Sequence, residues 1–210
     1  MTQHPGNQAI WRSGNLAIGR SKRMRISAGQ HRGRRLHTPR GKRTWPTSDL
    51  LRQALFNILG ERIQHARVLD LFAGSGAVGL EALSRGAATA TFVESDRRAV
   101  ESLQANIVTF RLAECARVMS ADVYQTLSRL QAAGERFDCI FLDPPYTGDL
   151  AAKCIETLAD GTLLSENATL ACQAFHKTAL PEQVGVLRQT WRRRYGESSL
   201  TLYEKESACR

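Results

Sequence analysis

Apolar residues follow two different spacings along the chain. After Thr47 and Ser48, either of which can cap a helix, they recur at the spacing of one helical face until Gly60 ends the helix. Farther along, strand-like runs alternate with helical segments. The predicted strands are 67–72, 89–94, 115–119, 137–142 and 168–175, and the predicted helices are 77–85, 97–108, 122–132 and 148–159. This alternation is typical of a parallel sheet covered by helices.

Both ends of the chain predict antiparallel features. Extended runs at 186–194 and 198–205 are separated only by residues 195–197, and so short a connection indicates a hairpin at the edge of the sheet. Near the start, residues 24–39 contain short extended pieces broken by glycines, which predicts a small basic β-hairpin. We therefore expect an α/β fold with a seven-stranded, mostly parallel sheet, a C-terminal antiparallel hairpin and a small N-terminal β-hairpin.

The composition is that of a folded domain. Of the 210 residues, 42% are hydrophobic and 23% are charged, which excludes wholesale disorder. No apolar run approaches the ~18 residues that a membrane span needs, and no secretory signal is readable. The five cysteines and five histidines lack the spacing of a disulfide framework or a zinc site. We therefore expect a cytoplasmic protein with reduced thiols and no metal.

Positive charge is concentrated at the N-terminal end. Residues 1–48 contain eleven Lys and Arg residues and no acidic residue, whereas the whole chain has a net charge of +9. Such segregation suggests an arm that contacts a polyanion, although a solvated tail or a targeting peptide would have the same composition. Residues 1–23 show no hydrophobic period and predict a disordered leader. The arm that follows offers four arginines to a polyanion: Arg25, Arg32, Arg34 and Arg35.

A glycine-rich motif follows the first predicted strand. It reads D-L-F-A-G-S-G-A-V-G from Asp70, and Gly74, Gly76 and Gly79 have the G-x-G-x-x-G spacing. Such glycines allow a ligand to approach the backbone closely, and the helix that follows offers free N–H groups. Glu94 ends the next strand, where a carboxylate can hold two ribose hydroxyls. Both NAD and S-adenosylmethionine can be bound in this way.

Two further carboxylates favour S-adenosylmethionine. Asp70 lies on the strand, four residues before Gly74, where it can meet a cationic amino-acid group but would repel a pyrophosphate. Asp122 follows the third strand, at a position suited to an adenine amine. It can equally serve as the N-cap of the next helix.

The second motif is Asp143-Pro144-Pro145-Tyr146, at the end of the fourth predicted strand. The two prolines stiffen the backbone, so that the Asp143 carboxylate and the Pro144 carbonyl are neighbouring acceptors for a planar amino group. The Tyr146 ring can stack on the base that carries this group. Acceptors that pull the amine hydrogens out of plane localise the lone pair for attack on a methyl sulfonium.

The sequence as a whole resembles the bacterial 16S ribosomal RNA guanine-N2 methyltransferases, whose family target is guanine 966 of the small subunit. The resemblance extends from about Met24 to Lys205. The segments that carry it are RISAGQHRGRRL, PTSDLLRQALFNIL, VLDLFAGSGAVGLEALSRGA, ATFVESDRRAV, FDCIFLDPPY and RRRYGESSLTLYEK. Many amino-methylating enzymes share the glycine motif and D-P-P-Y, whereas the basic hairpin, the P-T-x-D helix and the closing Y-G hairpin are more specific.

The resemblance implies a Rossmann-like methyltransferase that uses S-adenosylmethionine and acts on 16S rRNA, in a small-subunit assembly particle; no obligate protein partner is readable. We divide the chain into a leader over 1–23, a basic RNA-binding arm over 24–46 and a methyltransferase domain over 47–210. The residues expected to contact the cofactor are Asp70, Phe72, Gly74, Gly76, Glu94 and Asp122. Those expected to engage the guanine are Asp143, Pro144 and Tyr146.

Three positions depart from the family pattern. Trp45 replaces the arginine that usually precedes P-T. Leu50 and Gln53 remove a basic and an acidic residue from the helix that follows, while Arg52 is kept. These changes alter the contacts expected at this helix and leave both chemical motifs intact.

Other functions explain less of the sequence. A DNA adenine-N6 methyltransferase also uses D-P-P-Y, but the strands follow one another too closely for the usual target-recognition insertion. A glutamine-methylating enzyme more often reads N-P-P-Y and needs no basic arm. An NAD-dependent oxidoreductase leaves D-P-P-Y and the arm unexplained, and a non-catalytic RNA-binding module leaves both motifs without a role.

Overall fold

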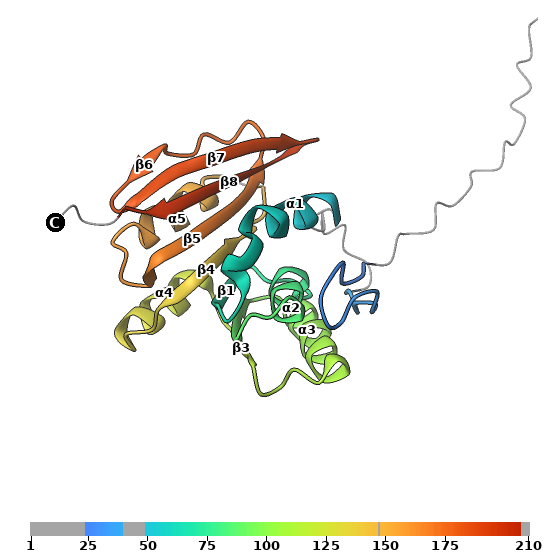
Figure 1. Cartoon of the computed structure of the whole chain (residues 1–210). Coiled ribbons are helices and arrows are strands. Elements are labelled where there is room, and N and C mark those ends of the chain that lie inside the picture. The colour runs from blue at the N-terminus through green and yellow to red at the C-terminus, as the bar shows by residue number, and fades with distance from the viewer. Residues whose placement is uncertain (1–23, 40–48, 147, 207–210) are drawn as a thin grey trace, which may run out of the picture.

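A computed structural model describes residues 24–39, 49–146 and 148–206 (Figure 1). The predicted leader, the last part of the predicted arm, Trp45 and the helix caps predicted at Thr47 and Ser48 lie outside the described residues. Within the described ranges, no helix has the length and apolar character needed to cross a membrane.

Eight strands in the described residues form one mixed sheet with the order β3-β2-β1-β4-β5-β8-β7-β6. The first five neighbours are parallel, and β5, β8, β7 and β6 pair in antiparallel fashion. The strand bounds are β1 Arg67–Leu71, β2 Thr89–Glu94, β3 Ala116–Ser120, β4 Phe137–Leu142, β5 Leu164–Phe175, β6 Gln183–Val184, β7 Leu187–Tyr195 and β8 Ser198–Lys205.

Helices cover both faces of this sheet (Figure 1). Apolar side chains of α1, α2 and α3 share one core cluster, and those of α4 and α5 share the other. Because the central strands are covered on both sides, their residues are buried at nearly every position instead of alternating between buried and exposed. The helix bounds are α1 Asp49–Leu59, α2 Ala77–Ser84, α3 Arg97–Phe110, α4 Val123–Ala132 and α5 Leu150–Leu158, with the 3-10 helix η1 at Gly60–Ile63.

The predicted parallel core is confirmed, but the strand count is wrong. The described residues form eight strands, whereas the sequence predicted seven. The strand that was not predicted is β6, which is only two residues long, and two residues carry no periodicity. The fifth strand also begins at Leu164, four residues before the predicted start at 168. The C-terminal antiparallel pair is present as β7 and β8, joined by the predicted short turn.

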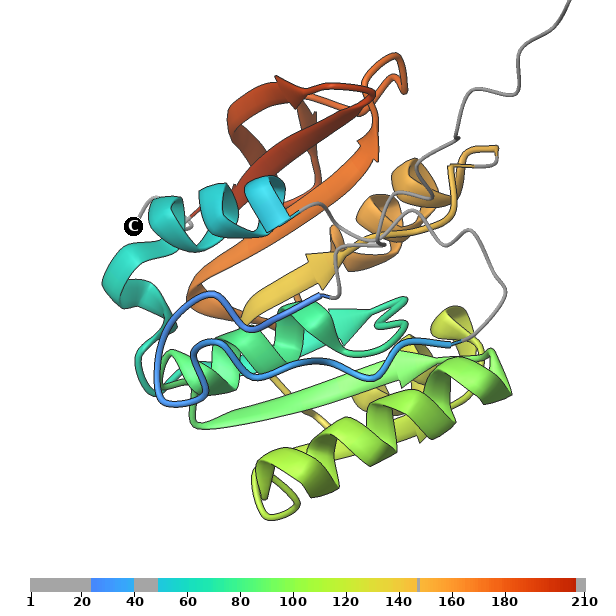
Figure 2. The ribbon, with the colours of Figure 1, turned by 90° about the vertical axis from the view of Figure 1, so that its right-hand side faces the viewer.

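The arm over 24–39 shows only part of the predicted β-hairpin. It folds back on itself, but the only bridge within it is the antiparallel one between Arg25 and Arg35. Its backbone also bonds to α2, with Gln30 N–H donating to Ser84 O at 2.8 Å. Figure 2 shows the arm lying across α2 and α3. Its polar backbone groups are thus satisfied partly within the arm, where Ile26 N–H donates to Arg34 O and Leu36 N–H to Met24 O, and partly by α2.

Candidate active site

The carboxyl ends of the parallel strands bring the predicted site together at one edge of the sheet. Chain order reverses between β1 and β4, which are neighbours in the sheet, and ligands of open α/β sheets bind at such a switch point. Asp70 stands near the end of β1, Glu94 ends β2, Asp122 follows β3 and Asp143 follows β4. All four carboxylates singled out from the sequence therefore lie at the same edge. The described residues contain no cluster of His, Cys, Asp and Glu that could hold a metal.

The turn after β1 is tightly wound. Phe72, Gly74 and Gly76 have positive φ angles of 60°, 57° and 80°, and for Phe72 this conformation costs on the order of 1–3 kcal/mol. A Cβ atom at Gly76 would lie 2.3 Å from Leu103 Cδ1, whereas one at Gly74 would meet open space. Gly76 thus permits packing against α3, and Gly74 leaves room for a ligand to approach.

The third glycine of the motif brings α2 onto a strand carboxylate. Gly79 N–H donates to Oδ2 of Asp70 at 2.9 Å. A Cβ atom at Gly79 would lie 2.3 Å from Phe92 Cε1 and 3.1 Å from that oxygen. This glycine therefore serves helix packing and the Asp70 contact.

Asp70 is a buried carboxylate with little positive charge around it. Its pKa is raised to about 7, chiefly because burial disfavours the charged form; the Gly79 bond lowers the pKa, while the carboxylates of Asp143 and Glu94 raise it further. A cation placed beside Asp70 would stabilise the ionised form. The binding of a cationic amino-acid group by Asp70 stays a prediction.

Glu94 ties the glycine turn to the next strand. Oε2 accepts the N–H of Gly74 at 2.8 Å, and Oε1 accepts the N–H of Asp96 at 2.7 Å. Each carboxylate oxygen can accept more than one hydrogen bond, so both retain capacity for hydroxyl groups. Glu94 therefore fixes the loop in place and remains a candidate for ribose binding.

Asp122 caps α4. Its Oδ1 accepts the backbone N–H groups of Tyr124 and Gln125 at 2.9 and 3.2 Å. Of the two interpretations of this residue, the structure displays the N-cap; the adenine contact stays a prediction.

The D-P-P-Y segment ends β4 beside β1. Asp143 N–H lies 3.5 Å from Leu71 O, so the segment starts to leave the sheet at this point. Pro144 is buried and Tyr146 is exposed. A small hollow next to the segment is lined by Pro144, Pro145, Tyr146, Gly148, Ala151, Ala174, Phe175 and Thr178. The three residues predicted to engage a guanine are thus contiguous at the edge of the sheet.

Two residues that the sequence did not single out hold the Tyr146 side chain. Its hydroxyl oxygen lies 2.6 Å from Ser198 Oγ and accepts a hydrogen bond from Gln173 Nε2 at 2.8 Å. The Tyr146 ring is also tilted against Phe175, with ring centroids 6.4 Å apart. The sequence does contain a clue to Gln173, because it is the one amide in an otherwise apolar strand end, A-C-Q-A-F.

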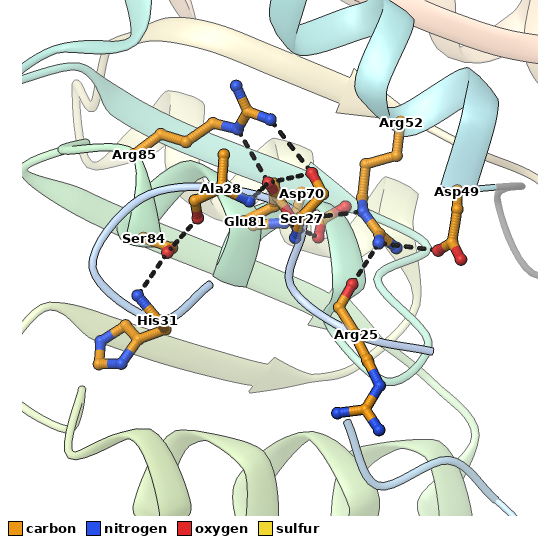
Figure 3. Close-up of polar contacts among 11 residues, drawn as sticks. Arg25, Ser27, Ala28, His31, Asp49, Arg52, Asp70, Glu81, Ser84 and Arg85 are labelled. Atoms are coloured by element: carbon orange, nitrogen blue, oxygen red, sulfur yellow. Dashed lines mark hydrogen bonds and ion pairs between the residues drawn. The ribbon is translucent and has the colours of Figure 1, made fainter. Parts of the chain in front are cut away.

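A buried ion cluster fastens the arm to α2 (Figure 3). Glu81 is fully buried, and its carboxylate accepts the N–H groups of Ser27 and Ala28 at 2.8 and 3.0 Å and the Ser27 hydroxyl at 2.6 Å. Arg85 Nε donates to the same carboxylate at 2.8 Å, and Arg52 Nε lies 3.5 Å away from it. Nothing in the motifs pointed to this cluster.

Arg52 connects α1 to the same cluster. It is completely buried, and its Nη2 donates to Arg25 O at 2.5 Å and to Asp49 Oδ1 at 2.9 Å. The departures at Leu50 and Gln53 are both exposed. Arg52, which keeps the family pattern, is therefore buried, and the two residues that depart from it face outward.

The far end of the arm reaches the glycine turn. Asn106 on α3 accepts the N–H of His37 at 2.7 Å and donates to His37 O at 2.9 Å and to Ser75 O at 3.0 Å. Asn106 is fully buried. One side chain thus links the arm to the turn that follows β1.

The four arginines predicted to bind RNA are exposed, but they differ in their contacts. Arg34 Nη2 donates to Thr109 O at 2.6 Å, and its guanidinium carbon lies 4.8 Å from the centre of the Phe110 ring. Arg25 Nη1 donates within the arm, at 2.7 Å. Neither Arg32 nor Arg35 has a side-chain bond in the described part of the chain. Their role in RNA binding stays a prediction.

Comparisons with known proteins agree with this arrangement. The family model described as conserved hypothetical protein 95 matches residues 24–204. Ribosomal RNA small subunit methyltransferase D of Escherichia coli K12 is 36% identical over 187 residues, which cover 89% of this chain and 92% of that protein.

Solved structures give the same result. The E. coli protein yhhF is 36% identical, with a TM-score of 0.78, and the match covers 89% of this chain and 99% of that one. A hypothetical protein of Thermus thermophilus is 39% identical, with a TM-score of 0.74, over 85% of this chain and 98% of that one. The described residues thus have the Rossmann-like methyltransferase fold, and the chain belongs to the family of ribosomal RNA small subunit methyltransferase D.

Proposed function

We propose that this protein transfers a methyl group from S-adenosylmethionine to the exocyclic N2 amine of a guanine in 16S rRNA, with guanine 966 as the expected target. The observation that carries the proposal is the position of D-P-P-Y at the β1–β4 switch point, next to the glycine turn. The relationship to a protein named as a small-subunit rRNA methyltransferase supports the choice of substrate.

The cofactor residues are proposed on the basis of charge and position. Asp70 meets the cationic amino-acid group, because it is a buried carboxylate short of positive partners. Glu94 accepts hydrogen bonds from the ribose hydroxyls, and Asp122 accepts one from the adenine amine. Phe72, Gly74 and Gly76 shape the turn that lies between these carboxylates. When bound, S-adenosylmethionine supplies the methyl group.

The guanine is held by D-P-P-Y. Asp143 and the carbonyl of Pro144 accept the two N–H groups of the amine, which localises the nitrogen lone pair towards the incoming methyl group. The ring of Tyr146 stacks on the base and keeps its orientation, because its hydroxyl is fixed by Ser198 and Gln173. A base presented in this way must leave its stack, which RNA loops and ends allow.

The basic arm supplies backbone contacts to the RNA. Arg25, Arg32, Arg34 and Arg35 are exposed on a segment fastened to α2 and linked to the glycine turn. Contacts to phosphates position a complex without reading sequence, so the arm orients the substrate while the pocket selects the base. We expect the substrate to be a small-subunit assembly particle in the cytoplasm.

A modification map tests the proposal. In 16S rRNA from a strain that lacks the gene, we expect the loss of one N2-methylguanine and its restoration by the intact gene but not by the Asp143→Ala variant. An unchanged map would contradict the assigned substrate. Thermal stabilisation by S-adenosylhomocysteine but not by NAD would separate this activity from that of an oxidoreductase.

A further inference from the structure

A second cluster of positive charge lies at the end of β7. This strand contains four arginines and no acidic residue, and Arg192, Arg193 and Arg194 are consecutive. Their side chains, named here the tip arginines, are all exposed. Charge on an open strand also discourages aggregation. However, β6 covers only Leu187 and Arg188, and the tip arginines stand at one end of the open edge instead of being spread along it.

The sheet places this end of β7 next to the candidate active site. β8 is antiparallel to β5 with Phe175 opposite Ser198, and β7 is antiparallel to β8 with Tyr195 opposite Ser198. The β7–β8 turn therefore lies at the same carboxyl edge as Asp143. The link is direct, because Ser198 Oγ lies 2.6 Å from the hydroxyl oxygen of Tyr146.

The tip arginines project from both faces of the sheet. Arg193 shares a face with Trp191 and Tyr195, which pack against the core cluster under α1. Arg192 and Arg194 alternate with it and point to the other face. An RNA backbone that passes over the tip would thus meet guanidinium groups on either side of the strand.

The guanidinium groups keep donors for a ligand. Arg192 uses one nitrogen, Nη2, to donate to the backbone oxygens of His176 and Thr178, at 3.3 and 2.9 Å. Arg194 donates from Nε to Gly196 O at 2.7 Å. Since an arginine has five N–H donors, these bonds orient the groups without exhausting them.

Little negative charge offsets the tip. Among the described residues, one carboxylate, that of Glu197, lies within ion-pair distance of the tip arginines, 3.8 Å from Arg194. The remaining surplus of positive charge favours a polyanion. Because the tip arginines lie beside Tyr146, the polyanion expected there is the RNA proposed as the substrate of the active site.

We propose that the tip arginines are a second RNA-binding surface, which contacts the phosphates next to the nucleotide held by Tyr146. The inference rests on the proposed function. Phosphate contacts on the flank of an extruded base fix the strand that carries it, so that the base enters the pocket in one orientation. The N-terminal arm and the tip then hold the RNA at two separate places, one on the α2 and α3 side and one beyond β5.

The test compares three variants with the wild type in affinity for unmethylated 16S rRNA across a range of salt concentrations. One variant has alanine at all three tip arginines, and a second has lysine there, which keeps the charge. The matched control replaces Arg62, Arg67 and Arg188 with alanine. The control removes the same three positive charges, but from the opposite end of the strands, where each arginine is paired with a carboxylate. Affinity for S-adenosylhomocysteine and the KM for rRNA are measured in parallel.

We expect the alanine variant to flatten the log–log salt slope by about two units, at about 0.7 per phosphate contact on single-stranded RNA. Its KM for rRNA should rise while its affinity for S-adenosylhomocysteine is unchanged. The lysine variant should keep most of the slope, and the control should keep all of it. A wild-type slope and KM in the alanine variant would overturn the proposal, and so would a lysine variant as weak as the alanine one. If the wild type neither binds nor methylates rRNA, the proposed function itself is wrong.

Discussion

Two buried carboxylates on or beside α2 have opposite surroundings. Asp70 and Glu81 are 2% and 0% exposed. Glu81 accepts two backbone N–H groups from the arm and lies against the guanidinium groups of Arg52 and Arg85. Its charge is thus compensated by the protein's own residues, and its role is to fasten one segment to another.

Asp70 has the reverse environment. In the described structure it accepts one backbone N–H, from Gly79, and its neighbours include the carboxylates of Asp143 and Glu94. A buried acid whose pKa is raised by its surroundings, at a switch point of the sheet, is a candidate for ligand binding. Burial is common to both carboxylates, so it is the charges around Asp70 that make it the candidate for ligand binding.

The largest expected effect comes from removing the compensated carboxylate. Glu81→Leu removes the buried partner of Arg52, whose other carboxylate contact, Asp49, is half-exposed, and breaking a buried pair costs about 3–5 kcal/mol. We expect a lower free energy of unfolding in urea and faster tryptic cleavage within residues 24–39. The control Glu101→Leu breaks the exposed pair with Arg97 and should cost less than about 1 kcal/mol. Unchanged stability of Glu81→Leu would show that this cluster does not hold the arm.

Asp143→Ala should separate chemistry from cofactor binding. Methyl transfer in a single-turnover assay should fall at least about a hundredfold, the low end for a positioned acid–base group. Cofactor affinity should be nearly intact, because the substitution removes a negative neighbour of Asp70 and no predicted cofactor contact. Retained turnover would mean that D-P-P-Y is only a turn at the end of β4.

Glu94→Ala should weaken cofactor binding by about 1.5–3 kcal/mol, the range for hydrogen bonds to a charged acceptor. Part of this loss would come from the turn, since Glu94 also accepts the N–H of Gly74. Glu94→Gln keeps an acceptor and should lose less. Calorimetry with S-adenosylhomocysteine measures both variants, and equal affinity of Glu94→Ala and the wild type would remove this residue from the site.

The smallest effects are expected at the arm. Replacing Arg25, Arg32, Arg34 and Arg35 with alanine should flatten the salt dependence of rRNA binding by somewhat under one unit per lost phosphate contact. Base selection should be unchanged. Removal of residues 1–23 should alter the slope little. If the fourfold variant keeps the wild-type slope, the charge of the arm has another purpose.

The parallel core and the position of both motifs could be predicted from the sequence. Apolar runs such as 137–142 are buried on both faces, and this leaves a strong local signal. β6 was missed because its two residues pair only through the turn before β7. The arm was expected to be a β-hairpin; it keeps one antiparallel bridge and bonds across the arm, and no local pattern showed that it would also bond to α2.

The site was predictable where local motifs carry it. Asp70 and Asp143 belong to motifs and were singled out for that reason, whereas Glu81 bonds to Ser27 and Ser198 to Tyr146, each more than fifty residues away in the chain. Their pairing depends on the fold, so no local pattern reveals it. The same holds for the tip arginines, whose place beside Tyr146 follows from the antiparallel register of β7 and β8.

The central claim is that Asp70 is the uncompensated acid that meets a cationic cofactor, and one titration tests it directly. Because its pKa is raised to about 7, the cation-binding ionised form is lost as the pH falls below 7. We expect the affinity for S-adenosylhomocysteine, measured by calorimetry, to weaken below pH 7 by up to about tenfold per pH unit. Asp70→Asn should bind weakly with no such dependence, and Glu81→Gln should keep it. A wild-type affinity that does not vary with pH, or an Asp70→Asn variant that binds as tightly as the wild type, would contradict the account.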